Sequence, residues 1–194
     1  MNKGRSEVIE TDELDLEQLP LDQLLEKVRR HHEQTLEERI PHLEALIDKF
    51  EPSNHEDESE EVVMTTSRQL MVCRDVLERH LAGEEEYLFP YVEQLMEAAE
   101  ENAAAPPRPD YLDEEFENEH QEVLEELESV REVVGSNSIP DDAREEFVEL
   151  DQELVRFEND VSEQLRMEEE ILLDRIADLE DKLSDEAKAK EATS

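Results

Sequence analysis

Apolar residues recur at steps of three and four over four long segments of this chain, and this spacing is typical of helices with one buried face. The segments cover residues 19–50, about 61–101, about 111–135 and about 139–183. Because only short connections separate them, consecutive segments should pack against one another in opposite directions. We therefore predict an all-α fold, an antiparallel up-down four-helix bundle.

The composition agrees with helices rather than with a sheet. The chain contains no Trp and only three Gly, and 40% of its residues are charged against 36% that are hydrophobic. A sheet protein would be expected to carry more β-branched and aromatic residues. We assign residues 19–184 to the bundle, and we predict that the polar residues 1–18 and 185–194 form a disordered N-terminal segment and a disordered tail.

Prolines mark irregular points in the helical pattern. Pro41 and Pro90 lie inside the first and second segments, where the missing backbone N–H should kink a helix. Residues 103–110 form a Pro-rich connection, and Ile139-Pro140 places a proline at the start of the last helix, where it is well tolerated. We therefore expect the first two helices to bend near their prolines.

The strong negative charge limits the partners of the chain. Its 59 acidic and 19 basic residues give a formal net charge of −40, which repels nucleic acid and anionic membranes. We therefore predict no nucleic acid and no membrane among its partners. No window approaches the roughly eighteen apolar residues of a membrane span, and residues 1–15 lack the apolar stretch of a signal peptide. The expected location is the cytoplasm.

Cys73 is the single cysteine of the chain. It allows no internal disulfide and no zinc or iron–sulfur site built from cysteines. Cys73 lies among Leu70, Val76 and Leu77, which predicts a small residue of the core.

Two acidic residues occupy positions that a helix should bury. Glu84 falls on the apolar stripe of the second segment, four residues after His80, and Glu168 has the same place in the fourth segment, four residues after Gln164. The surrounding sequences, HLAGEEEYL and QLRMEEEIL, form a weak internal repeat. A buried carboxylate costs several kcal/mol unless it is paired or bound to a metal. Several such groups converging from four helices indicate compensation by a cation.

Histidines extend this set. Residues four apart project from one helix face, so His80 and Glu84 can reach the same metal site. His32 and His120 also fall on apolar stripes, in the first and third segments. Carboxylates can bridge two ions while imidazoles fill the outer positions. This mixture suits iron, or manganese as a close rival, better than calcium, which prefers oxygen ligands.

Ordinary explanations stay open for these residues. A His on an apolar face is often a satisfied core residue. Glu84 and Glu168 each head an acidic run, so they would be exposed if the helix phase differed by one residue. His55 lies in a loop, where a solvated His is the usual expectation, and Tyr87 is either core or the lining of a pocket.

Five motifs follow one another along residues 20–180: Val28-Arg-Arg-His31-His32-Glu33, Ile40-Pro41-His42-Leu43-Glu44, His80-Leu-Ala-Gly-Glu84-Glu85-Glu86-Tyr87-Leu88-Phe89-Pro90, Asn118-Glu119-His120-Gln121 and Met167-Glu168-Glu169-Glu170-Ile171-Leu172. In this order and spacing they resemble the hemerythrin-like, or HHE cation-binding, family. The similarity is closest to its di-iron branch implicated in repair of iron–sulfur clusters.

The resemblance implies a site with two non-haem iron ions. It implies that Glu84 and Glu168 are bridging carboxylates and that the terminal ligands are His32, His55, His80 and His120. The chain departs from the family at Gln164, where the family has a His. The spacing between His32 and Pro41 is also one residue long, so His31 remains an alternative ligand.

The resemblance also implies a function. A protein of this kind binds or reduces a small diatomic ligand, O2 or NO, in stress response or iron–sulfur cluster repair, with a protein or redox partner left open. Gln164 and the lack of a Cys-bearing N-terminal segment leave the repair function open, and whether the chain is an enzyme also stays open. The alternatives are a non-catalytic iron store or sensor on the same fold and a metal-free acidic helical interaction bundle.

Overall fold

The computed structural model describes residues 16, 18–49, 57–113, 115–135 and 144–191, most of which are helical and none of which belong to a strand. Four long helical runs, compatible with a helical bundle, account for most of this part of the chain. They are α2 (Leu21–Gln34) with η1 (Thr35–Arg39) and α3 (Ile40–Asp48); α4 (Asp57–Gly83) with η2 (Glu84–Leu88) and α5 (Phe89–Glu101); α6 (Glu115–Gly135); and α7 (Arg144–Met167) with η4 (Glu168–Leu172) and α8 (Leu173–Glu191).

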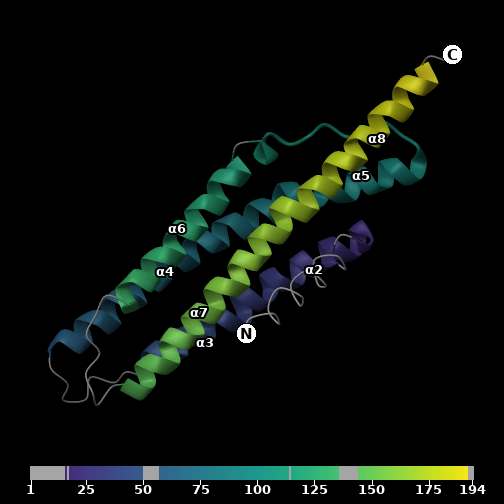
Figure 1. Ribbon diagram of the computed structural model, residues 1–194. Helices are drawn as coiled ribbons and strands as arrows, with labels where there is room; N and C mark the ends of the chain where they lie inside the picture. The colour runs from purple at the N-terminus through teal and green to yellow at the C-terminus, as the bar shows by residue number, and fades with distance from the viewer. Residues whose placement is uncertain (1–15, 17, 50–56, 114, 136–143, 192–194) are drawn as a thin grey trace, which may run out of the picture. The chain divides into compact units, whose positions relative to one another are not determined.

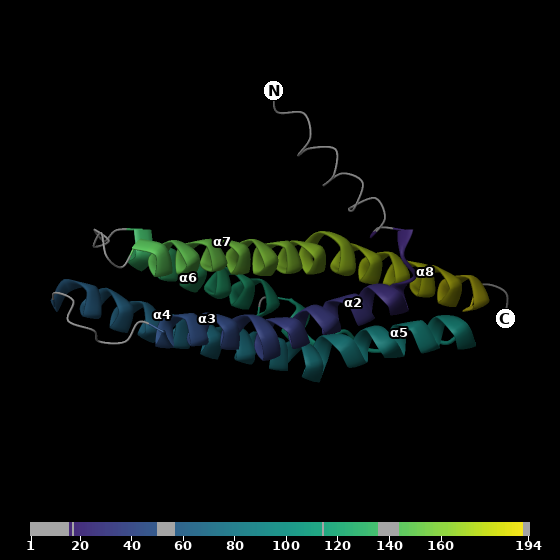
Figure 2. The ribbon, with the colours of Figure 1, turned by 90° about the horizontal axis from the view of Figure 1, so that it is seen from below.

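The chain divides into two compact units, and each is described by itself. Unit 1 contains the described residues up to His31, Phe89–Arg108 and the residues from Gln164 onward, whereas unit 2 contains His32–Leu88 and Pro109–Glu163. In unit 2, α4 packs along α6 (Figure 1), and α3 lies beside α4 (Figure 2). In unit 1, α5 packs against α8 (Figure 1). None of the described helices combines the length and apolar character that a bilayer span requires.

Three π-helical segments interrupt the runs in the described part of the chain: η1, η2 and η4. The burial pattern explains two of them. Residues on one face recur every four positions, and in a regular α-helix each step of four overshoots a full turn by about 40°. Three such steps would carry the last residue about 120° away from the first. Two runs of four residues are nevertheless buried throughout: His80, Glu84, Leu88 and Val92, and Gln164, Glu168, Leu172 and Ile176.

A π-helical turn includes one more residue than an α-helical turn, so it returns such a run to the buried face. η2 begins at Glu84 and η4 begins at Glu168, in the middle of the two runs. Proline is not the common cause. Pro41 and Pro90 lie two residues after the ends of η1 and η2, at the points where we expected kinks, but no proline lies within η4 or after it. The four-residue recurrence of buried side chains is what η2 and η4 share.

The uninterrupted helix α6 shows the contrary case. Leu124 lies four residues after His120 and belongs to the apolar spacing of the third predicted segment. It is 39% exposed, whereas Val123 and Leu127 are buried. With no π-helical segment in α6, the buried face follows the ordinary three-and-four spacing and leaves Leu124 outside. In η2, Leu88 lies on the buried face, whereas Tyr87 is 43% exposed and is therefore not part of the core.

Arginines connect the helices of unit 2 across an acidic surface. Arg74 in α4 contacts Glu44 in α3, Arg39 in η1 contacts Asp160 in α7, and Arg131 in α6 contacts both Asp151 and Glu158 in α7. Each exposed pair adds little stability on its own. Together they place scarce positive charge between helices that would otherwise repel one another.

In unit 1 the connection after α5 is fixed to α8. The Tyr91 hydroxyl and Arg108 both donate hydrogen bonds to the Glu180 carboxylate. Asn102 ends α5 with a positive φ of 53°, the left-handed conformation that closes many helices. The backbone N–H of Ala103 then donates to the carbonyl oxygen of Ala98, which completes this helix end.

The last helix is longer than the sequence pattern indicated. We expected it to end near Leu183 and the polar residues from 185 onward to be disordered, but α8 continues to Glu191. Ala187 and Ala189 are strong helix formers, and Lys188 and Lys190 stabilise the negative end of the helix dipole. Helix propensity therefore extends α8 beyond its apolar stripe.

Cys73 should be inert in the folded protein. Its side chain is 1% exposed, and burial raises the pKa of the thiol to about 12, with the charge of Glu126 acting in the same direction. Because the thiolate is the reactive form, we expect a disulfide reagent at pH 8 to modify Cys73 at least about a thousandfold more slowly than in guanidinium-unfolded chain. Rapid labelling of one thiol per folded chain would contradict this packing.

Candidate metal centre

Three predicted ligands lie together inside unit 2. His80 and Glu84 come from the junction of α4 and η2, and His120 comes from α6. The side chains are 0%, 0% and 1% exposed, respectively. One nitrogen of each His and one carboxylate oxygen of Glu84 lie within 4.8 Å of one another. These separations suit atoms that share a bound cation.

His32 joins this group from the end of α2. Its Nε2 lies 2.9 Å from Oε2 of Glu84, and its side chain is buried. The neighbouring His31 is half-buried. Of the two histidines that the sequence left as alternatives, His32 therefore reaches the buried carboxylate.

The histidine rings are held against an aromatic wall. The rings of His80 and His120 meet edge to face with centroids 4.6 Å apart. Phe116, one turn before His120 on α6, packs against the His120 ring at 4.2 Å. Phe116 is 1% exposed, so it shields this side of the cluster from water. Low polarity strengthens electrostatic interactions within such a site.

A second carboxylate faces the other edge of His80. Nε2 of His80 lies 3.9 Å from Oε1 of Glu84, while Nδ1 lies 3.5 Å from Oε2 of Glu119. The Tyr111 hydroxyl donates a 2.8 Å hydrogen bond to the same Glu119 oxygen. Burial raises the pKa of Glu119, but the proximity of His80, the hydrogen bond from Tyr111 and the charge of Arg79 outweigh it, so the pKa is lowered overall. Glu119 is therefore a carboxylate at neutral pH.

The glycine of the HLAGE motif makes room for Tyr111. A Cβ on Gly83 would lie 2.7 Å from the Tyr111 hydroxyl and 2.9 Å from two ring carbons. No side chain fits there unless Tyr111 moves. Tyr111 belongs to the short 3-10 turn η3 (Asp110–Leu112), so the connection before α6 carries it to this position.

Glu168 belongs to unit 1, where it is the first residue of η4. It is 0% exposed, and Gln164 one turn earlier is 1% exposed. The Gln164 amide nitrogen donates a 3.1 Å hydrogen bond to Oε1 of Glu168. Gln164 has the place in its motif that His80 has in the related motif of unit 2, and its amide donates to the carboxylate that follows one turn later.

His32, His80, Glu84 and His120 lie close together in unit 2, and Glu168 is buried in unit 1. His55 lies outside the described residues, so its role stays a prediction. Sequence reasoning did not identify Glu119 and Tyr111 as residues that lie beside the histidine cluster. The available signal for Glu119 was that it directly precedes His120, a histidine on the apolar face of its helix.

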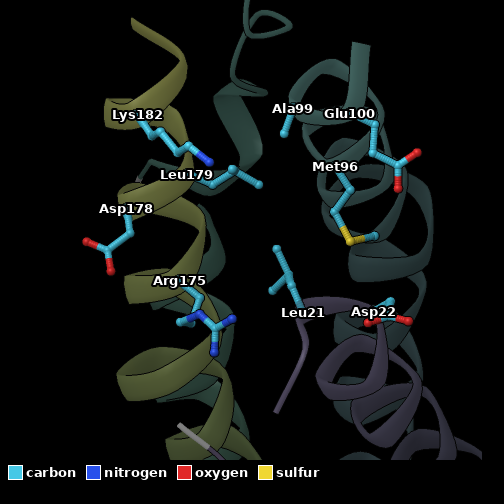
Figure 3. Close-up of a pocket in the computed structure, with 9 residues that line it drawn as sticks. All are labelled: Leu21, Asp22, Met96, Ala99, Glu100, Arg175, Asp178, Leu179 and Lys182. Atoms are coloured by element: carbon cyan, nitrogen blue, oxygen red, sulfur yellow. The ribbon is translucent and has the colours of Figure 1, made fainter. Parts of the chain in front are cut away.

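An open groove of about 580 Å³ lies in unit 1, between α2, α5 and α8. Figure 3 shows Arg175 and Lys182 on one wall together with Asp178, and Glu100 and Asp22 on the opposite wall. Arg175 donates a hydrogen bond to the backbone oxygen of Leu19. The charges are mixed and the groove is open, so it selects neither a cation nor an anion.

Comparisons with protein-family models, with curated proteins and with solved structures gave no match to this chain. Function must therefore be argued from the side chains themselves.

Proposed function

We propose that the buried His and Glu side chains bind non-haem iron, two ions per chain, in a hemerythrin-like bundle that binds or reduces O2 or NO. One observation carries the proposal. Among the described residues, eight polar or charged side chains are buried, and two of them are threonines. The other six are His32, His80, Glu84, His120, Gln164 and Glu168, which are the five described residues of the predicted ligand set and Gln164.

The energetics support a cation. In a chain of net charge −40, mutual repulsion and hydration both favour acidic side chains that remain exposed to water. Glu84 and Glu168 are the acidic residues that are fully buried in the described part of the chain. A buried carboxylate is costly unless hydrogen bonds and positive charge compensate it, and a bound cation would supply such charge. Imidazoles grouped around a carboxylate offer the donors that iron and manganese accept.

The proposed roles follow the donor types. Glu84 and Glu168 would be the carboxylate ligands of the metal, and His32, His80 and His120 would be histidine ligands, with His55 as a further one. Bound iron would supply electron exchange and an open coordination position for a diatomic ligand. The chain itself holds the donors in place and keeps bulk water out through Phe116 and the buried apolar face of α4.

Gln164 favours a second candidate function, a non-catalytic iron store or sensor. Its amide donates to Glu168 and is a poorer iron ligand than imidazole, so one metal position would be weaker than the other. A store or sensor would bind O2 or NO stably or release iron without turnover. Repeated consumption of O2 or NO by the iron-loaded protein would instead favour an enzyme.

Metal content is the direct test of the proposal. We expect about two irons per chain in protein purified from iron-replete cells, together with near-ultraviolet and visible absorption bands of an oxygen-bridged iron pair. About one iron would indicate that Gln164 weakens one position. Chain that binds neither iron nor manganese, even after anaerobic reconstitution, would contradict the proposal and leave the metal-free acidic bundle.

A further inference from the structure

The side of His80 that faces away from Glu84 carries a chain of polar groups whose role the ligand set does not explain. Tyr111 donates to Oε2 of Glu119 at 2.8 Å, and the same oxygen lies 3.5 Å from Nδ1 of His80. All three side chains belong to unit 2. The Tyr111 residue is 5% exposed, and the exposed fraction of the Glu119 side chain is 12%. We propose that Tyr111 and Glu119 are positioning residues that fix which nitrogen of His80 meets a metal ion.

The chemistry of imidazole makes this choice necessary. A neutral imidazole carries its proton on one nitrogen and a lone pair on the other, and only the lone pair can bind a metal. His80 lies between two carboxylates, with Glu84 facing Nε2 and Glu119 facing Nδ1. Either could accept the N–H, so the ring alone does not decide between the two tautomers.

The geometry favours the proton on Nδ1. Glu119 lies nearer to its nitrogen, at 3.5 Å against 3.9 Å for Glu84. An ionised carboxylate only accepts hydrogen bonds, so an N–H at Nδ1 is stabilised there and a lone pair is repelled. With the proton on Nδ1, the lone pair of Nε2 points toward Glu84 and the metal position. Histidine ligands in metal sites commonly donate their second N–H in this way.

Glu119 can act this way because its own position is fixed. The hydroxyl of Tyr111 binds Oε2, and the guanidinium of Arg79 lies 4.0 Å from Oε1. Tyr111 in turn sits over Gly83, where a Cβ would collide with its hydroxyl, and its ring lies beside Tyr87 with centroids 5.3 Å apart. Gly83, which directly precedes Glu84, therefore makes room for Tyr111, which is not itself a proposed ligand.

The inference rests on the proposed metal site, but its first test needs no metal. Nitrogen-15 NMR of the metal-free, histidine-labelled protein reports which nitrogen of a neutral ring carries the proton, and the His80→Asn spectrum assigns the signals. We expect the Nδ1–H form in wild type over the pH range in which the ring is neutral. Glu119→Gln should shift the ring toward Nε2–H, because the amide NH2 can donate to Nδ1.

The matched control is Glu122→Gln. Glu122 lies one turn further along α6, contacts the same Arg79 and is exposed. This variant removes the same charge from the same helix and should leave the His80 tautomer unchanged. Tyr111→Phe keeps the ring but removes the donor to Glu119, and it should shift the tautomer in the same direction by a smaller amount. It also provides a second variant if Glu119→Gln does not fold, as judged by circular dichroism.

Metal affinity gives the second readout. Ferrous iron titrated anaerobically against a coloured chelator should bind Glu119→Gln roughly 10- to 100-fold more weakly than wild type, and Glu122→Gln as well as wild type. Wild type that binds no iron would overturn the proposed function, while the NMR result would still decide the role of Glu119. An unchanged His80 tautomer in both Glu119→Gln and Tyr111→Phe would overturn the inference.

Discussion

Glu84→Gln is expected to abolish tight metal binding and, with it, the stabilisation that metal gives to the folded chain. The carboxylate is 0% exposed, lies 2.9 Å from His32 and shares the cluster with His80 and His120. The amide has nearly the same shape but no charge and one oxygen fewer. Loss of outer hydrogen-bond partners alone weakens metal sites roughly 10- to 100-fold, so loss of this ligand should exceed that range.

Thermal unfolding with and without metal measures this effect. At a free metal concentration of about 100 times the dissociation constant, binding stabilises the wild-type fold by about 2.7 kcal/mol. For a chain of this length, that corresponds to a rise in Tm of roughly 5–10 °C. Chelator should reverse the rise in wild type, whereas the Tm of Glu84→Gln should not respond to metal or to chelator.

Glu85→Gln is the matched control, because Glu85 is the next residue of η2 and is exposed. It should keep the full metal-dependent rise in Tm. A metal-free acidic bundle predicts a different pattern, in which chelator leaves wild type unchanged and Glu84→Ala is neutral or stabilising because a charge leaves the core. That pattern would refute the metal centre.

The sequence predicted the helical runs because their buried faces follow a periodic pattern. The starts at Leu21 and Glu115 and the ends at Glu101 and Gly135 fall at or near the breaks that prolines, glycine and polar residues mark. It did not predict the π-helical segments. A pattern described only as steps of three or four residues does not separate alternating steps from several consecutive steps of four. Only consecutive steps of four require a wider turn to keep every residue on the buried face.

The sequence predicted those site residues whose burial can be inferred from the helical pattern. His80 and Glu84 stand out because polar residues rarely fall on an apolar stripe, and both are buried. Glu119 and Tyr111 lack that signal. Glu119 resembles dozens of other acidic residues, and Tyr111 belongs to the connection before α6, so only tertiary structure brings it to Gly83.

Gln164→His is the second substitution with a large expected effect, and it should tighten the weaker metal position. The amide nitrogen of Gln164 now donates to Glu168 at 3.1 Å, whereas an imidazole at the same place would offer a lone pair. Histidine is the natural replacement because of the internal repeat. With it, residues 164 and 168 become a His and Glu pair like residues 80 and 84. We expect at least about a tenfold gain in affinity for the second ferrous ion.

Gln152→His is the control for this substitution, because Gln152 is exposed on the same helix, α7. It adds the same side chain without a buried carboxylate beside it, so the second binding step should stay as in wild type. If Gln164→His instead binds the second ion no more tightly than wild type, Gln164 is not the limiting residue. Turnover of O2 or NO that rises together with the affinity for the second ion would show that Gln164 restrains an enzyme. Tighter iron binding with no turnover would favour the store or sensor.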